Sequence, residues 1–143
     1  MRILVTGARG MLGTDLCAEL GKRHDVTGFD LAEADLTAPA SVAALAAQRP
    51  QAVIHCAAMA DVDGCERDPD AAYAVNALGT RHVALACQRL DVPLLYVSTD
   101  FVFDGAQREP YVEWDRPNPL GHYGRSKLAG ETCVRELLPR HFI

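Results

Sequence analysis

The sequence predicts an α/β fold with a doubly wound parallel sheet, and three observations support this prediction. Short apolar runs suited to buried strands recur along the 143 residues. Ala-rich stretches with helical spacing separate these runs. The first apolar run leads directly into a glycine-rich turn. Alternating strands and helices are typical of parallel βαβ units with right-handed crossovers.

The individual elements follow from local signals. Residues 2–6 form a continuous apolar run, which suits a strand covered on both faces. Asp68 and Pro69 supply an N-cap and a first-turn proline for a long helix. Residues 104–119 are polar and Pro-rich without periodicity, which is typical of a functional loop. We expect strands over 2–6, 25–29, 52–56 and 93–98, helices over 11–20 (with Gly21 as C-cap), 39–48, 69–90 and 122–137, and a new strand from His141.

Composition excludes several classes of protein. Hydrophobic residues make up 49% and charged residues 23%, and the formal net charge is −5. No basic cluster interleaved with aromatic residues is present, which argues against a nucleic-acid partner. No apolar run approaches the roughly 20 residues that a membrane span needs. The chain enters a strand at once, so we expect no signal peptide and a cytoplasmic location. Five cysteines without a C-x-x-C motif indicate reduced thiols rather than disulfides or structural zinc.

The segment Thr6 to Gly13 (TGARGMLG) has the form of a dinucleotide-binding turn between a strand and a helix. In such turns Gly7 permits the tight bend, Gly10 lets a pyrophosphate approach the backbone, and Gly13 lets the helix pack closely. The free N–H groups at the helix N-terminus favour the phosphates. The alternative is an ordinary turn. It is disfavoured because an acidic residue ends the next predicted strand, as in dinucleotide-binding domains. The sequence therefore predicts a Rossmann-type NAD(P)-binding domain over residues 1–143.

The preference between NAD and NADP is left open by two conflicting signals. Asp30 ends the second predicted strand, where a carboxylate binds ribose hydroxyls and favours NAD. Arg9 lies in the glycine turn, where a guanidinium favours a 2′-phosphate and hence NADP. Asp35 and Leu36 either flank the adenine or only form a turn before Pro39. Both cofactors remain candidates.

Small residues and carboxylates follow the third predicted strand. Ala57 and Ala58 leave room for a cofactor at the carboxyl edge of the sheet. The acidic run that follows does not fit a calcium site, because no 12-residue loop ends in Glu. We expect no metal ligands there, and none in the scattered histidines, which are more typical of structural or surface positions. The acidic run is Asp61, Asp63, Glu66 and Asp68, and the histidines are His24, His55, His82, His122 and His141.

Three side chains are candidate catalytic residues. Tyr123 and Lys127 are four residues apart on a predicted helix, so they share one face. A neighbouring ammonium lowers the pKa of a tyrosine, which suits a proton donor to a carbonyl oxygen. Thr99 ends the fourth predicted strand, where its hydroxyl would orient that carbonyl. The alternatives are a solvated helix face for the pair and a strand-end cap for Thr99.

Together these motifs resemble the extended short-chain dehydrogenase/reductases, and within them most of all the dTDP-4-dehydrorhamnose reductase family. The resemblance covers essentially all 143 residues and is most specific in TGARGMLG, VIHCAAMADVDGCERDP, VNALGT, STDFVFDG and YGRSKLAGE. It implies that Thr99, Tyr123 and Lys127 are catalytic. It also implies cofactor contacts from Met11, Leu12, Ala60 and Asn76. The implied reaction is NAD(P)H-dependent reduction of the 4-keto group of a dTDP-6-deoxy-4-ketohexose.

One position distinguishes subfamilies. Related 4,6-dehydratases carry an Asp-Glu pair after the strand-end Thr, whereas Phe101 follows Asp100 here. The resemblance therefore favours simple reduction. It further implies a homodimer and, in some members, magnesium, for which no ligands are assignable here. It also implies a C-terminal substrate domain beyond residue 143, without which we expect no reductase activity.

Two alternatives stay open. One is a different extended-family reductase or an epimerase that acts on another nucleotide sugar. The other is a non-catalytic, dinucleotide-binding regulatory subunit of the same fold.

Overall fold

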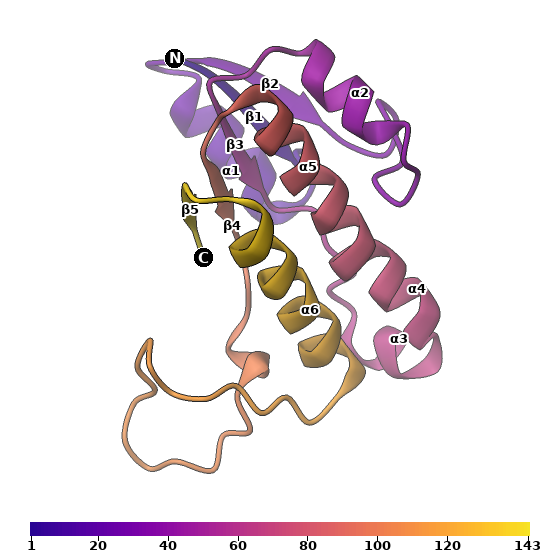
Figure 1. The fold of residues 1–143 in the computed structure, drawn as a ribbon, viewed down its shortest axis with the longest axis vertical. Helices are drawn as coiled ribbons and strands as arrows, with labels where there is room; N and C mark the ends of the chain where they lie inside the picture. Colours follow the sequence, from indigo (N-terminus) through magenta and orange to yellow (C-terminus); the bar gives the residue numbers. More distant parts are fainter.

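The computed structural model describes residues 1–143. Their strands form one five-stranded parallel sheet (Figure 1). The strand order is β2-β1-β3-β4-β5, so the chain winds outward in both directions from the pair β1 and β3. A crevice at such a reversal is the usual ligand site of an open α/β sheet. The strands are β1 (Arg2–Thr6), β2 (Asp25–Phe29), β3 (Ala52–His55), β4 (Leu94–Tyr96) and β5 (His141–Phe142).

Helices lie on both faces of this sheet, which confirms the predicted doubly wound α/β fold. In Figure 1, α2, α5 and α6 lie in front of the strands and α1 lies behind them. The six helices are α1 (Met11–Leu20), α2 (Ser41–Ala47), α3 (Val62–Arg67), α4 (Pro69–Tyr73), α5 (Thr80–Leu90) and α6 (His122–Leu137).

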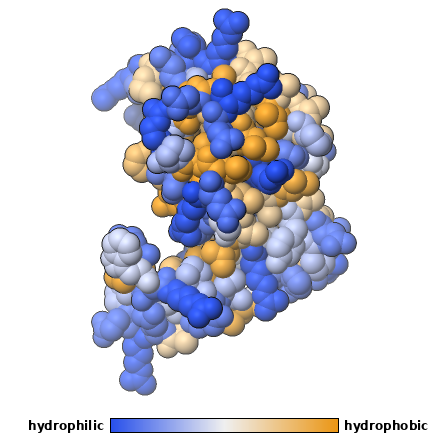
Figure 2. All heavy atoms as spheres, in the orientation of Figure 1, coloured by the Kyte–Doolittle hydropathy of each residue, from blue (hydrophilic) through white to orange (hydrophobic).

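The main core lies between the sheet and α2, α5 and α6. Leu4 and Leu94 are fully buried from the strands, and Val83 and Val134 are fully buried from α5 and α6. The opposite face of the outer strands is less covered, since the Leu95 side chain is 41% exposed. In Figure 2 apolar atoms gather over the upper and central part of the molecule, and the lower end is mostly hydrophilic.

The predicted long helix over 69–90 contains a wider turn than expected. Its segments α4 and α5 are joined by a π-helical turn, Ala74–Gly79. The Thr80 hydroxyl donates a hydrogen bond to the carbonyl of Asn76 at 2.7 Å. A side chain that bonds the preceding turn in this way disturbs regular α-helical pairing. The helix start was predicted correctly, because the Asp68 carboxylate caps the N–H of Ala71.

Other differences from the predicted elements are local. The short helix α3 was missed, since its six residues include a glycine and give no periodicity. The third strand ends at His55 rather than Cys56, and the fourth covers only 94–96. Gly21 follows α1 as expected, but with right-handed backbone angles. The approximate range predicted for α6, the longest helix, agrees with its observed ends.

A buried histidine joins the central strands to α5. His55 stacks on Tyr96 at 5.4 Å and lies 2.6 Å from the Thr6 hydroxyl through Nδ1 and 3.0 Å from the Thr80 hydroxyl through Nε2. Because Thr80 donates its own proton to Asn76, it accepts from Nε2–H of a neutral imidazole. Burial, with the nearby Lys127 ammonium, lowers the pKa of His55 to about 3. This supports the structural role predicted for His55.

We predict that acid destabilises the fold through His55. The imidazole is protonated near its ordinary pKa when unfolded but only near pH 3 when folded. The folded state therefore loses stability as pH falls below about 6.5, by about 2 kcal/mol at pH 5 relative to pH 8. Urea unfolding at both pH values measures this loss. A His55→Gln variant should be less stable at pH 8 but lack most of the pH dependence, and an equal dependence in both proteins would refute the prediction.

Candidate functional site

The glycine turn brings the ends of β1 and β3 into contact. Gly7 has a positive φ of 69°, and a Cβ there would lie 2.6 Å from the Ala57 backbone nitrogen. At Gly13, in the first turns of α1, a Cβ would lie 2.1 Å from the Gly7 carbonyl oxygen. Neither position tolerates a side chain, so the turn folds tightly against the start of α1. This is the geometry the sequence predicted for a dinucleotide turn.

A cavity of about 350 Å³ opens beside this turn, at the carboxyl ends of β1, β2 and β3. Seven of the predicted cofactor residues line it: Gly7, Gly10, Asp30, Asp35, Leu36, Ala57 and Ala58. Five more line it that the sequence did not single out: Leu31, Ala34, Thr37, Cys56 and Val75. Cys56 had a signal, because it directly precedes the two alanines. The others come from the segment after β2 and, for Val75, from the π-helical turn between α4 and α5, whose approach depends on the tertiary fold.

The cavity has the features that a dinucleotide needs. Its walls combine a glycine cradle at the N-terminus of α1 with an acidic group at the end of β2. The side chains present therefore fit an NAD(P) cofactor.

Seven predicted cofactor residues do not line this cavity: Met11, Leu12, Gly13, Ala60, Asn76, Tyr123 and Lys127. Met11 is 93% exposed and Leu12 is 47% exposed, and Ala60 is also exposed. Asn76 is completely buried. Its side-chain oxygen accepts a hydrogen bond from the Met59 N–H at 2.8 Å, and its side-chain nitrogen donates to the Met59 carbonyl and to the Ser126 hydroxyl, each at 3.0 Å. These bonds hold the segment after β3 against α6, and the cofactor contact expected from Asn76 stays a prediction.

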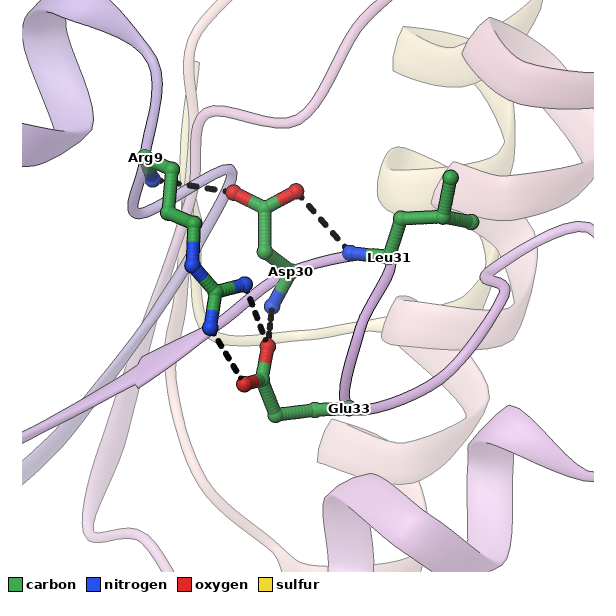
Figure 3. Close-up of polar contacts among 4 residues, drawn as sticks. All are labelled: Arg9, Asp30, Leu31 and Glu33. Atoms are coloured by element: carbon green, nitrogen blue, oxygen red, sulfur yellow. Dashed lines mark hydrogen bonds and ion pairs between the residues drawn. The ribbon is translucent and has the colours of Figure 1, made fainter.

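Asp30 and Arg9 are connected through Glu33 (Figure 3). The Asp30 carboxylate accepts hydrogen bonds from the N–H of Arg9 and of Leu31, each at 2.9 Å. Glu33 accepts from both terminal nitrogens of the Arg9 guanidinium, at 2.9 and 2.6 Å, and from the N–H of Asp30 at 2.7 Å. The bond from Arg9, together with that from the Asp30 backbone, lowers the pKa of Glu33 to about 2. Glu33 had no signal in the sequence.

Lys127 is held at the end of β4. Its ammonium donates to the Val97 carbonyl at 2.7 Å and lies 4.1 Å from the centre of the Tyr96 ring. The side chain is 2% exposed, and burial lowers the pKa of Lys127 to about 8, while the Glu131 carboxylate acts in the opposite direction. A buried lysine with a depressed pKa is typical of functional sites.

Tyr123 and Thr99 are linked through Phe101. The Phe101 ring meets the Tyr123 ring edge-on at 5.6 Å, and the Phe101 N–H donates to the Thr99 hydroxyl at 3.2 Å. Thr99 thus forms the local cap that was the alternative to a catalytic role, and its hydroxyl donates to the Asp100 carboxylate at 3.2 Å. Tyr123 lines a second cavity, of about 400 Å³, together with Phe103, Tyr111 and Leu120. The loop over 104–119 supplies part of this wall and contains no helix or strand, as predicted.

Buried side chains of α6 fix the segment that precedes Thr99. Glu131 is 4% exposed and accepts a hydrogen bond from the Ser98 hydroxyl at 2.6 Å. Its other oxygen pairs with Arg135 at 3.0 Å. At the helix start, Glu66 accepts from the N–H of His122 at 2.5 Å, which satisfies a free amide. Lys127 and Glu131 therefore hold consecutive residues, Val97 and Ser98.

Metal binding and membrane crossing are the two remaining features that the structure bears on. No three His, Cys, Asp or Glu side chains are grouped as a metal ion requires. None of the helices combines the length and apolar character that a membrane crossing demands.

The family of the chain follows from one comparison. The family model described as the RmlD substrate binding domain matches residues 1–143. The chain belongs to this family. It is accordingly an extended short-chain dehydrogenase/reductase, as the motifs predicted.

Individual members of the RmlD family show how close the similarity is. The chain is 43% identical to a dTDP-4-dehydrorhamnose reductase of Mycobacterium tuberculosis. The alignment has 143 positions and covers 96% of this chain and 47% of that protein. It is 42% identical to a dTDP-4-keto-6-deoxy-D-glucose reductase of Streptomyces niveus, covering 96% and 49%. The crystal structure of dTDP-4-dehydrorhamnose reductase from Bacillus anthracis in complex with NADP superposes with a TM-score of 0.95 at 43% identity, covering 99% and 51%. The chain thus spans about half the length of these relatives.

We predict that Glu131 stabilises the strand end beside Thr99. Replacing Glu131 by Ala should lower the free energy of unfolding by about 2–3 kcal/mol, because Ser98 and Arg135 lose a buried partner. It should also lower the pKa of Lys127 further, since the carboxylate favours the ammonium. Denaturant unfolding and an NMR titration of the Lys127 side chain measure the two effects. Glu136→Ala, an exposed change on the same helix, is the control, and equal effects of the two substitutions would contradict the prediction.

Proposed function

We propose that this chain binds NAD(P)H and provides the catalytic residues for reducing the 4-keto group of a dTDP-6-deoxy-4-ketohexose. The observation that carries the proposal is the cavity beside the glycine turn, with Lys127 buried at the carboxyl edge of the same sheet. The names of the relatives from M. tuberculosis and S. niveus support the substrate class. The complex of the B. anthracis relative with NADP supports the cofactor class.

The cavity residues divide the binding of the cofactor between them. The backbone of Gly7 and Gly10 would hold the pyrophosphate at the N-terminus of α1, where free N–H groups favour an anion. Asp30 lies where the adenosine ribose would bind, and Asp35 and Leu36 would lie beside the adenine. Ala57 and Ala58 leave space beyond the end of β3. When bound, the reduced nicotinamide supplies the hydride.

The reacting carbonyl would lie between Thr99 and Tyr123. The Thr99 hydroxyl, whose proton is directed to the Asp100 carboxylate at 3.2 Å, would turn that proton to the carbonyl oxygen and orient it. Tyr123 gives its phenolic proton to that oxygen as the carbon is reduced. Lys127 lies one helical turn further along α6, where its ammonium donates to the Val97 carbonyl at 2.7 Å. The 400 Å³ cavity beside Tyr123 is on the side where the sugar would enter.

The substrate-binding half of the enzyme is proposed to lie outside these residues. The domain over 1–143 would then hold the cofactor and the Tyr/Lys helix, and further residues would select the sugar nucleotide. We propose a homodimer for the full-length protein, in the cytoplasm and without a nucleic-acid partner. The family resemblance supports the dimer, and five free thiols support a reducing compartment.

The proton-transfer role of Tyr123 can be tested in the full-length protein that the gene encodes. We expect Tyr123→Phe to lower kcat at least about 100-fold with little change in KM, because only the proton donor is removed. Steady-state reduction of a dTDP-4-keto-6-deoxyhexose measures this. The control is Tyr73→Phe, which removes a phenol from the surface of α4. Full turnover by Tyr123→Phe would disprove the mechanism.

The substrate class requires its own experiment. We expect kcat/KM with a dTDP-linked 4-ketohexose to exceed that with UDP- and GDP-linked analogues by at least about tenfold, the order of discrimination that a few lost contacts give. A preference for another nucleotide would favour the alternative of a different extended-family reductase or epimerase. Dinucleotide binding without turnover of any ketosugar would favour a regulatory subunit.

A further inference from the structure

The Arg9 guanidinium, the group expected to face a 2′-phosphate, is held by another residue of the chain. Both of its terminal nitrogens donate to the Glu33 carboxylate, at 2.9 and 2.6 Å (Figure 3). This two-point geometry is the strong form of an arginine–carboxylate pair. One oxygen of Glu33 also accepts from the N–H of Asp30. Glu33 is therefore fixed to the end of β2 as well as to Arg9.

These contacts lie beside the part of the cavity proposed for the adenosine ribose. Asp30, Leu31 and Ala34 line that part, and Glu33 lies between them in sequence. Each oxygen of the Asp30 carboxylate accepts one backbone N–H, from Arg9 or Leu31. A carboxylate oxygen has two lone pairs, so each oxygen can still accept a ribose hydroxyl. An acceptor that is free for hydroxyls suits NAD and repels a phosphate.

The charges at this position point the same way. Asp30 and Glu33 carry two negative charges and Arg9 carries one positive charge, so the group as a whole is negative. The Glu33 carboxylate is ionised at neutral pH, and its bonds to Arg9 and to the Asp30 N–H lower its pKa to about 2. A 2′-phosphate would therefore have to displace Glu33 from Arg9 while approaching Asp30. Because the Arg9 and Glu33 side chains are 61% and 35% exposed, water and salt weaken the pair, which sets a preference rather than an exclusion.

We propose that Glu33 determines cofactor specificity by occupying Arg9, so that the chain binds NAD(H) in preference to NADP(H). This inference rests on the proposed dinucleotide binding. It resolves the conflict between Asp30 and Arg9 in the sequence, because Glu33 removes Arg9 from the competition and leaves Asp30 available.

The test is the ratio of the Kd for NADP to the Kd for NAD, measured by NMR titration of the 143-residue chain. A ratio is informative even when both affinities are weak. We expect a ratio above one for the unmodified chain. Glu33→Gln keeps an acceptor for the Asp30 N–H but frees the Arg9 charge, so the ratio should fall about fivefold, the upper range for one exposed ion pair. Adding Arg9→Gln to Glu33→Gln should restore the ratio.

The matched control is Glu19→Gln, which removes the same charge from a pair with Lys22 on the outer surface of α1. We expect it to leave the ratio unchanged. Preference for NADP by the unmodified chain, or an equal shift from Glu19→Gln and Glu33→Gln, would overturn the role of Glu33. Absence of binding of either dinucleotide by all variants would instead refute the proposed cofactor function, and the inference with it.

Discussion

The close approach of Gly7 to Ala57 is the constraint on which the rest of the site depends. It brings the carboxyl ends of β1 and β3 into backbone contact, at the point where the winding of the sheet reverses. Any side chain at Gly7 would separate these ends, and the positive φ would strain it as well. The cavity and the start of α1 follow from this contact. The position of Asp30 depends on the same end of β1, because Asp30 follows β2 and β2 pairs directly with β1.

The second half of the site depends on α6. Two buried side chains of this helix, Lys127 and Glu131, bind the two residues that precede Thr99. Neither charge is solvated, so each must find its partner within the protein. The same helix carries Tyr123, and the end of β4 is therefore aligned with it by interactions that are also part of the core. Stability and the placement of the proposed catalytic groups are not separable here.

The buried polar groups form a continuous layer beneath the site. His55 connects β1 and α5 through two hydroxyls, and Asn76 connects the segment after β3 to α6 through Ser126. Each satisfied group fixes the relative position of two elements that are far apart in the sequence. The π-helical turn at Ala74–Gly79 belongs to this layer, since its residue Asn76 accepts a hydrogen bond from the hydroxyl of Thr80, the residue after the turn.

The sequence by itself determined the order and type of nearly all elements and the residues of the glycine turn. These features depend on local signals: apolar runs, caps, and glycines where no side chain fits. It also predicted Asp30, Tyr123 and Lys127 as site residues, because strand ends and helical spacing are local properties. Only the tertiary structure decided that Asn76 is buried, that Glu131 holds Ser98, and that Glu33 occupies Arg9. Those contacts join residues up to 50 positions apart, whose pairing no local pattern specifies.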